Sequence, residues 1–181
     1  MKLKLIKRVQ HVLGDIIAIE DNQAILLTYF RNNILHAFVL PSLVAALVEH
    51  NGKISKSDLL NVIRTLYPFL KAELFLKWKD SEIKAQVTEY VDALAQANLI
   101  FVDDEDFIFS PAPNSEDHNQ LAVLAAPVRQ SLERYYMTLA LITQRGSGNI
   151  SIRQVEELSH LVGQRLSVLY EFNSPEFFDK A

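Results

Sequence analysis

Apolar residues recur every three or four positions along most of this chain of 181 residues, and this spacing predicts α-helices. The spacing is most regular in three runs, which cover residues 82–97, 121–142 and 151–169. In each run the apolar side chains share one face of the helix, and that face can pack against a neighbouring helix. The pattern therefore predicts a mainly α protein built as a helical bundle.

A different pattern lies between the first two of these runs. Residues 99–102 and 107–109 are short apolar stretches on either side of four acidic residues at 103–106. Two such stretches around a polar turn predict a β-hairpin. Helical patterns precede the hairpin, and this order of elements is that of a winged helix. We therefore expect a small winged-helix-like segment, residues 53–110, that contains one β-hairpin.

Serine residues are placed to begin three of the expected helices. Ser55 has Asp58 three residues later, a pair that resembles a capping box. Ser81 and Ser151 precede two of the regular apolar runs, so each is expected to act as a helix N-cap.

Three prolines lie inside apolar runs, and proline interrupts the hydrogen-bond ladder of a helix. We expect Pro41 to break or kink its helix, Pro68 to start a new turn or helix, and Pro127 to kink or divide the long run around it. At the start of the chain, residues 1–13 have helical spacing. The short, β-branched stretch 15–20 that follows favours a strand or an extended lead-in to the next helix.

Turn-forming residues divide the chain into three expected units: residues 1–52, 53–110 and 111–181. The first ends at Asn51 and Gly52, and the second ends at a linker, residues 110–120, that contains two prolines and several small polar residues. Near the end, Ser174 and the proline after it have the chemistry of another helix start. The chain continues for only about two turns beyond that point, so the third unit is expected to be truncated.

The most apolar stretch, residues 22–48, is interrupted at its centre by Arg31, Asn32, Asn33 and His36. A membrane-spanning helix needs about 18 consecutive apolar residues, and a charge with three polar groups in mid-span is costly. We therefore reject a membrane span here. The four polar side chains are candidates for either a buried polar cluster or an interface with another domain.

Charge and composition narrow the possible functions. The chain is soluble in character, with 22% charged residues and a net charge of −4, and it contains no cysteine. Disulfides, zinc ribbons and thiol nucleophiles are therefore excluded. The third helix of the winged-helix-like segment carries Glu82, Glu89 and Asp92, and the turn of the hairpin is acidic. Both surfaces would repel phosphate, so nucleic acid is not an expected partner.

No constellation of residues points to catalysis. The five histidines have no H-E-x-x-H spacing, and the chain has no G-x-S-x-G elbow. The glycines at 146 and 148 lack the lysine of a phosphate-binding loop. We therefore expect no catalytic residue, no cofactor and no metal site in this chain.

Several stretches nevertheless resemble one family, the long, membrane-associated glycerol-3-phosphate acyltransferases of Gram-negative bacteria. The resemblance is carried, in family order, by GDIIAIEDNQAILLTYFRNNILHAFVLPSLVAALV, LYPFLKAELFLKW and QRLSVLYEFNSPEFFDKA. It covers the chain from about residue 10 to the end. It implies a parent enzyme that transfers an acyl group from acyl-CoA or acyl-carrier protein to the 1-position of glycerol 3-phosphate, in phospholipid biosynthesis.

The catalytic H-x-x-x-x-D signature of that family is missing here. The residues five positions after the histidines are Ile16, Pro41, Ser55, Val123 and Arg165, and none is aspartate. The resemblance therefore implies the non-catalytic, helical C-terminal region of such an enzyme, which is not expected to be active alone. Its implied partner is the acyltransferase catalytic domain of the same chain.

The implied location is peripheral, at the cytoplasmic side of the bacterial inner membrane, whose surface is a second candidate partner. An alternative from another class is an independent winged-helix-like module that binds other proteins.

Overall fold

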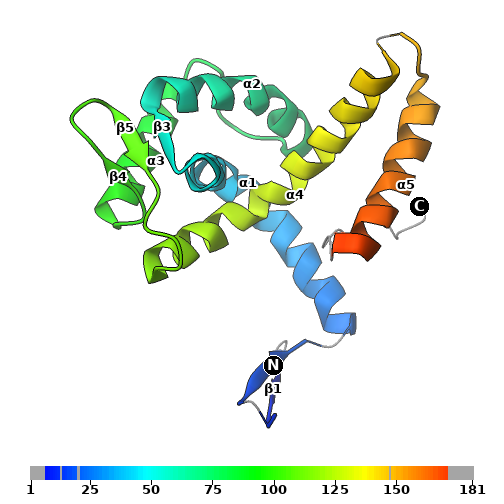
Figure 1. Ribbon diagram of the computed structural model, residues 1–181, viewed down its shortest axis with the longest axis horizontal. Helices are drawn as coiled ribbons and strands as arrows, with labels where there is room; N and C mark the ends of the chain where they lie inside the picture. Colours follow the sequence, from blue (N-terminus) through cyan, green and yellow to red (C-terminus); the bar gives the residue numbers. More distant parts are fainter. Residues whose placement is uncertain (1–6, 13, 20, 147, 171–181) are drawn as a thin grey trace.

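The computed structural model describes residues 7–12, 14–19, 21–146 and 148–170. Most of these residues are helical, so the predicted mainly α class is confirmed (Figure 1). The elements in chain order are β1 (Lys7–Val9), β2 (Ile16–Ala18), α1 (Asp21–Asn51), β3 (Lys53–Ser55), α2 (Lys56–Leu74), α3 (Ile83–Gln96), β4 (Phe101–Val102), β5 (Phe107–Phe109), α4 (Glu116–Arg145) and α5 (Ile152–Tyr170).

The predicted hairpin is confirmed as β4 and β5, which pair antiparallel with Val102 opposite Ile108. The other side of β5 pairs with β3, so the strand order of the small sheet is β3-β5-β4. The connection from α1 into β3 runs through Gly52, which has a φ of +69°. Glycine adopts this left-handed conformation without the steric cost that a Cβ would bring. The carbonyl of Gly52 accepts a hydrogen bond of 2.8 Å from the Ser110 amide, and this bond joins the two ends of the winged-helix-like segment.

All three prolines lie inside continuous helices, so a helix break at Pro41, a new start at Pro68 and a division at Pro127 are wrong. The alternative at Pro41 and Pro127, a kink, stays a prediction. A proline in a helix leaves the carbonyl four residues earlier without its usual partner. Those carbonyls belong to Ala37, Arg64 and Val123, and all three residues are exposed. Water can reach a carbonyl on an exposed face of a helix, which lowers the cost of a proline at such a position.

The N-terminal residues also differ from the sequence-based expectation. The helix expected over residues 1–13 is wrong in its described part, because Lys7–Val9 forms strand β1 and pairs antiparallel with β2. The strand expected after it is confirmed as β2. Val9 and Val12 are exposed, so an amphipathic helix at this place would have no core to pack against. The β-branched residues of the two stretches favour strand pairing instead.

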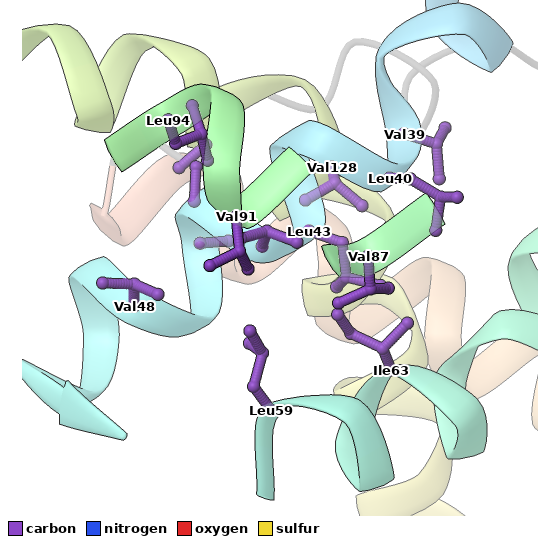
Figure 2. Close-up of a cluster of buried hydrophobic side chains, with 14 of the residues drawn as sticks. Val39, Leu40, Leu43, Val48, Leu59, Ile63, Val87, Val91, Leu94 and Val128 are labelled. Carbon is purple, nitrogen blue, oxygen red and sulfur yellow. The ribbon is translucent and has the colours of Figure 1, made fainter. Parts of the chain in front are cut away.

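The hydrophobic core lies where the second half of α1 crosses α2, α3 and the first half of α4. Figure 2 shows Leu43 of α1 close to Val91 of α3 and Val128 of α4, with Leu59 and Ile63 of α2 on the other side of the cluster. The fully buried side chains of this core include Val39, Leu40, Leu43, Val44, Val48, Leu59, Ile63, Leu70, Ile108, Leu121 and Val128. One core thus joins residues from all three expected units, and the division into separate units stays a prediction.

Two parts of the molecule extend away from this core. The first half of α1 leaves the core and ends beside the β1–β2 hairpin, and the second half of α4 leaves it in another direction (Figure 1). Helix α5 returns beside α4, with which it makes its principal packing contact. The helix start expected at Ser174 lies outside the described residues.

Side-chain caps fix most of the helix starts. The Ser55 hydroxyl accepts a hydrogen bond of 3.0 Å from the Asp58 amide, as predicted. Ser151 and Gln154 form the expected reciprocal cap at α5. The cap expected at Ser81 is wrong, because α3 begins at Ile83 with Glu82 as its N-cap residue and without a side-chain capping bond. The Glu82 carboxylate accepts a hydrogen bond from the Lys79 amide instead, at 2.7 Å.

Replacing Ser55 with alanine is expected to lower the free energy of unfolding by about 1 kcal/mol, because the first turn of α2 loses an acceptor for an amide. Chemical denaturation followed by circular dichroism measures the change. The matched control is Ser81→Ala, which removes a serine that caps nothing and should change stability by less than about 0.5 kcal/mol. Equal effects of the two substitutions would contradict the assigned caps.

Candidate interaction surface

The first half of α1 carries large apolar side chains that the core does not cover. Tyr29, Phe30, Ile34 and Phe38 are all exposed, and the rings of Tyr29 and Phe30 lie edge to face with centroids 6.0 Å apart. Single exposed apolar residues are normal on a protein surface, whereas several together on one helix mark an interaction site. The outer half of α1 is therefore the first component of a candidate interaction surface.

One face of α1 passes from the core to the surface. Along it, Tyr29, Asn33, His36, Leu40, Leu43 and Leu47 follow one another at steps of three or four residues. Leu40 and Leu43 are fully buried, whereas Tyr29, Asn33 and His36 are exposed. The same face thus changes from aliphatic to polar and aromatic where the helix leaves the core.

The structure places the four sequence-predicted site residues on this outer half. Asn33 and His36 are exposed, and the Asn33 amide donates a hydrogen bond of 3.0 Å to the Tyr29 carbonyl of its own helix. The side chains of Arg31 and Asn32 lie outside what the structure describes. The described pair is therefore not buried within this chain, and the role of the four residues in an interface stays a prediction.

On another side of α1, an apolar groove runs between this helix and α4. It has a volume of about 350 Å³ and is lined by Ile34, Leu35 and Phe38 of α1 and by Gln120, Val123, Leu124 and Pro127 of α4. Val123 is the most open of the apolar residues in this lining, with 74% of its surface exposed. Gln120 supplies the only polar side chain, and no lining residue is charged. We call this feature the α1–α4 groove.

The two walls of the α1–α4 groove are held in place by contacts below it. Ala45 of α1 and Ala125 and Val128 of α4 are fully buried, and α1 packs more extensively against α4 than against any other element. An ion pair of 2.7 Å between the Arg129 guanidinium and the Glu49 carboxylate also joins the two helices. The groove is therefore a preformed feature of the fold.

A second polar contact ties α4 to the end of α2. Glu73 of α2 accepts hydrogen bonds from the Arg134 guanidinium, at 2.5 Å, and from the Tyr135 hydroxyl. Burial, together with the hydrogen bond to Glu73, raises the pKa of the Tyr135 hydroxyl, so this group stays protonated and continues to donate. The contact fixes the direction in which α4 leaves the core.

The lining of the α1–α4 groove consists of apolar residues and one amide. The lining of the α1–α4 groove contains no titratable side chain. In the part of the chain that the structure describes, no three His, Cys, Asp or Glu residues gather closely enough to hold a metal ion. The α1–α4 groove can bind by apolar contact and by hydrogen bonds of the Gln120 amide.

One stretch of the described residues, Asn33–Asn51, is long and apolar enough to cross a membrane by length and composition alone. The core helix of a soluble protein passes the same test, and 44% of this window is buried inside the protein. In this structure its aliphatic side chains, among them Leu40 and Leu43, form the centre of the core. The criterion is therefore weak evidence for a membrane span here.

The sequence reasoning identified the α1 side of the surface and missed the α4 side. Leu124 lies in the run 121–142, whose apolar face was expected to pack against a neighbouring helix, and Val123 was not singled out as a surface residue. A second apolar stripe was nevertheless present, because Gln120, Val123, Leu124 and Pro127 follow the i, i+3, i+4, i+7 spacing of one helix face. Only the fold shows that this stripe lies beside α1.

Comparison with known proteins identifies relatives across the whole chain. The family model described as "Glycerol-3-phosphate acyltransferase C-terminal region" matches residues 1–181. A glycerol-3-phosphate acyltransferase of Pseudomonas aeruginosa (strain LESB58) is 39% identical over 179 residues, which is 99% of this chain and 21% of that protein. Proteins with the same name from Pseudomonas fluorescens (strain Pf0-1) and Ectopseudomonas mendocina (strain ymp) are each 36% identical over 179 residues, with 21% and 22% of their lengths covered.

The chain thus spans about a fifth of the length of these relatives. No solved structure is significantly similar to it.

Proposed function

The chain belongs to the family of glycerol-3-phosphate acyltransferase C-terminal regions, and from that premise we propose that it is a non-catalytic helical part of such an enzyme. The reaction of the parent enzyme would be acyl transfer from acyl-CoA or acyl-carrier protein to the 1-position of glycerol 3-phosphate. In this proposal the region supports the catalytic domain of the same chain by packing against it. It contributes no catalytic group itself.

The observation that carries the proposal is the exposed outer half of α1, in a chain that covers only about a fifth of the length of its relatives. Tyr29, Asn33 and His36 continue the face of α1 that forms the core, yet all three are exposed in the part of the chain that the structure describes. A neighbouring domain would bury Tyr29 and offer partners to the amide and imidazole groups. In our proposal Arg31 and Asn32 belong to the same interface.

A peripheral location at the cytoplasmic side of the bacterial inner membrane is part of the proposal. The relatives are bacterial acyltransferases by name, and the parent reaction would make a phospholipid precursor. The lining of the α1–α4 groove carries no lysine or arginine to attract anionic lipid. We therefore propose that this groove faces protein, and that any contact with the membrane surface uses another part of the parent enzyme.

A second candidate function is an independent winged-helix-like module for protein interaction. The strand order β3-β5-β4, with the second half of α1 ahead of β3, favours this reading. Binding to nucleic acid is disfavoured, because Glu89 and Asp92 lie exposed on α3 and the turn after β4 is acidic. A stable monomer that binds proteins other than acyltransferases would support this candidate.

Removing this region from a full-length acyltransferase that ends in it is expected to lower acyl transfer to glycerol 3-phosphate by about a hundredfold or more, because small displacements of catalytic groups are costly. Incorporation of radiolabelled glycerol 3-phosphate into lipid measures the rate. The same assay on this chain alone is expected to give no transfer. Acyl transfer by the isolated chain, or full activity of the shortened enzyme, would overturn the proposed function.

A further inference from the structure

We propose that the α1–α4 groove is the seat for an apolar helix face or loop of the catalytic domain that precedes this region in the parent chain. This inference rests on the proposed function and names a contact within it. It adds the α4 wall, centred on Val123, to an interface for which the sequence indicated only α1. The occupant is a part of the same polypeptide, with one or two large aliphatic or aromatic side chains that enter the groove.

The chemistry of the groove favours such an occupant. Ile34, Phe38 and Val123 present apolar surface to solvent, and their positions on two helices make the site concave. Concave apolar grooves between helices accept the convex, apolar face of a helix or a protruding loop. The Gln120 amide at the rim can bond to a backbone group of the occupant.

Lipid fits the same groove poorly. Surfaces that bind membranes combine protruding apolar residues with lysine or arginine at their edge. The groove is a concave site between two helices, and its lining contains no charged residue. A neutral protein segment matches both of these properties.

The position of the groove favours the same chain over a second copy. The relatives have about four-fifths of their length outside the matched part, and the family is described as a C-terminal region, from which we infer that most of that length precedes it. In such a chain the preceding part joins ahead of β1 and β2, which lie beside the start of α1 (Figure 1). The α1 residues that line the groove, Ile34, Leu35 and Phe38, belong to the outer half of the same helix. A tethered segment has a high effective concentration at a nearby groove.

Thiol labelling tests the occupancy of the groove directly, because the chain contains no cysteine of its own. Val123→Cys places a thiol at the open edge of the groove, and Val62→Cys is the matched control on the outer face of α2, where 37% of the valine is exposed. Each variant is labelled with a maleimide, both in this chain and in a full-length acyltransferase that ends in it and has no other cysteine. The measured quantity is the ratio of the two labelling rates for each position.

The thiol at position 123 is expected to react about tenfold or more slowly in the full-length enzyme than in this chain, because the core of an interface is buried from solvent and reagent. The thiol at position 62 is expected to react at similar rates in both. Equal labelling rates at position 123 in the two proteins would overturn the proposed occupant of the α1–α4 groove. They would do so even if removal of the region abolished acyl transfer, so this test can fail while the proposed function stands.

Two further outcomes would also overturn the proposed occupant. One is protection of position 123 in this chain alone that grows with protein concentration, which would assign the groove to a second copy. The other is protection in the full-length enzyme that appears only on addition of vesicles of phosphatidylethanolamine and phosphatidylglycerol, which would assign it to lipid.

Discussion

Replacing Leu43 with alanine is expected to lower the free energy of unfolding by about 3–5 kcal/mol, because the substitution removes buried methyl groups and leaves a cavity. Leu43 has no exposed surface and lies where α1 meets α3 and α4, close to Val91 and Val128 (Figure 2). Because α1 packs against α2, α3 and α4 around this core, we expect the helices not to close the cavity completely. Urea denaturation monitored by tryptophan fluorescence and circular dichroism measures the loss.

The matched control for this variant is Leu139→Ala on the outer half of α4, where the leucine is largely exposed. It should change the free energy of unfolding by about 0.5 kcal/mol or less. If both leucine substitutions had similar effects, the core would not be centred on the second half of α1.

Enlarging Ala125 to leucine is the second substitution with a large expected effect. Ala125 is fully buried on the side of α4 that packs against α1. Extra methyl groups at such a site force the helices apart or push side chains out of their preferred rotamers, at a cost of about 1–3 kcal/mol. Thermal unfolding measures this cost, and a displaced α4 would also change the shape of the α1–α4 groove.

Its neighbour provides the control, since Ala126 has the same helical context and is exposed. Ala126→Leu should leave the unfolding temperature within a few degrees of the parent value. A larger loss from Ala126→Leu than from Ala125→Leu would mean that α4 presents a different face to α1.

Much of the fold could be predicted from the sequence because local patterns determine it. The apolar spacing of residues 82–97 predicted the buried face of α3, and Ile83, Val87, Val91 and Leu94 are indeed buried. The acidic turn between two apolar stretches predicted the β4–β5 hairpin. In both cases the residues that form the element also carry the signal, so no distant contact was needed to interpret it.

The helix lengths could not be predicted in the same way. Pro41 and Pro127 were expected to break or kink their helices, because proline removes a backbone hydrogen bond. The cost depends on whether the abandoned carbonyl reaches solvent, and that is decided by which face of the helix the core covers. This information comes from tertiary packing, which also gives α1 its length of 31 residues.

The candidate surface was only partly predictable for a related reason. Asn33 and His36 stand out in the sequence as polar interruptions of an apolar run, so their half of α1 was recognised. Val123 does not stand out, because an exposed valine in an amphipathic helix looks the same in sequence as a buried one. Its place in the surface follows from the crossing of α1 and α4. Residues that meet at this crossing are far apart in the chain; Glu49 and Arg129, for example, are separated by 80 residues.

The labelling rate of Val123→Cys in the full-length acyltransferase is the most direct test of the central claim, that this region packs against the catalytic domain of its own chain through the α1–α4 groove. We expect this thiol to react about tenfold or more slowly there than in the isolated region, whereas the labelling rate of the control thiol at position 62 should not change. A Val123→Cys thiol that reacts equally fast in both proteins would contradict it.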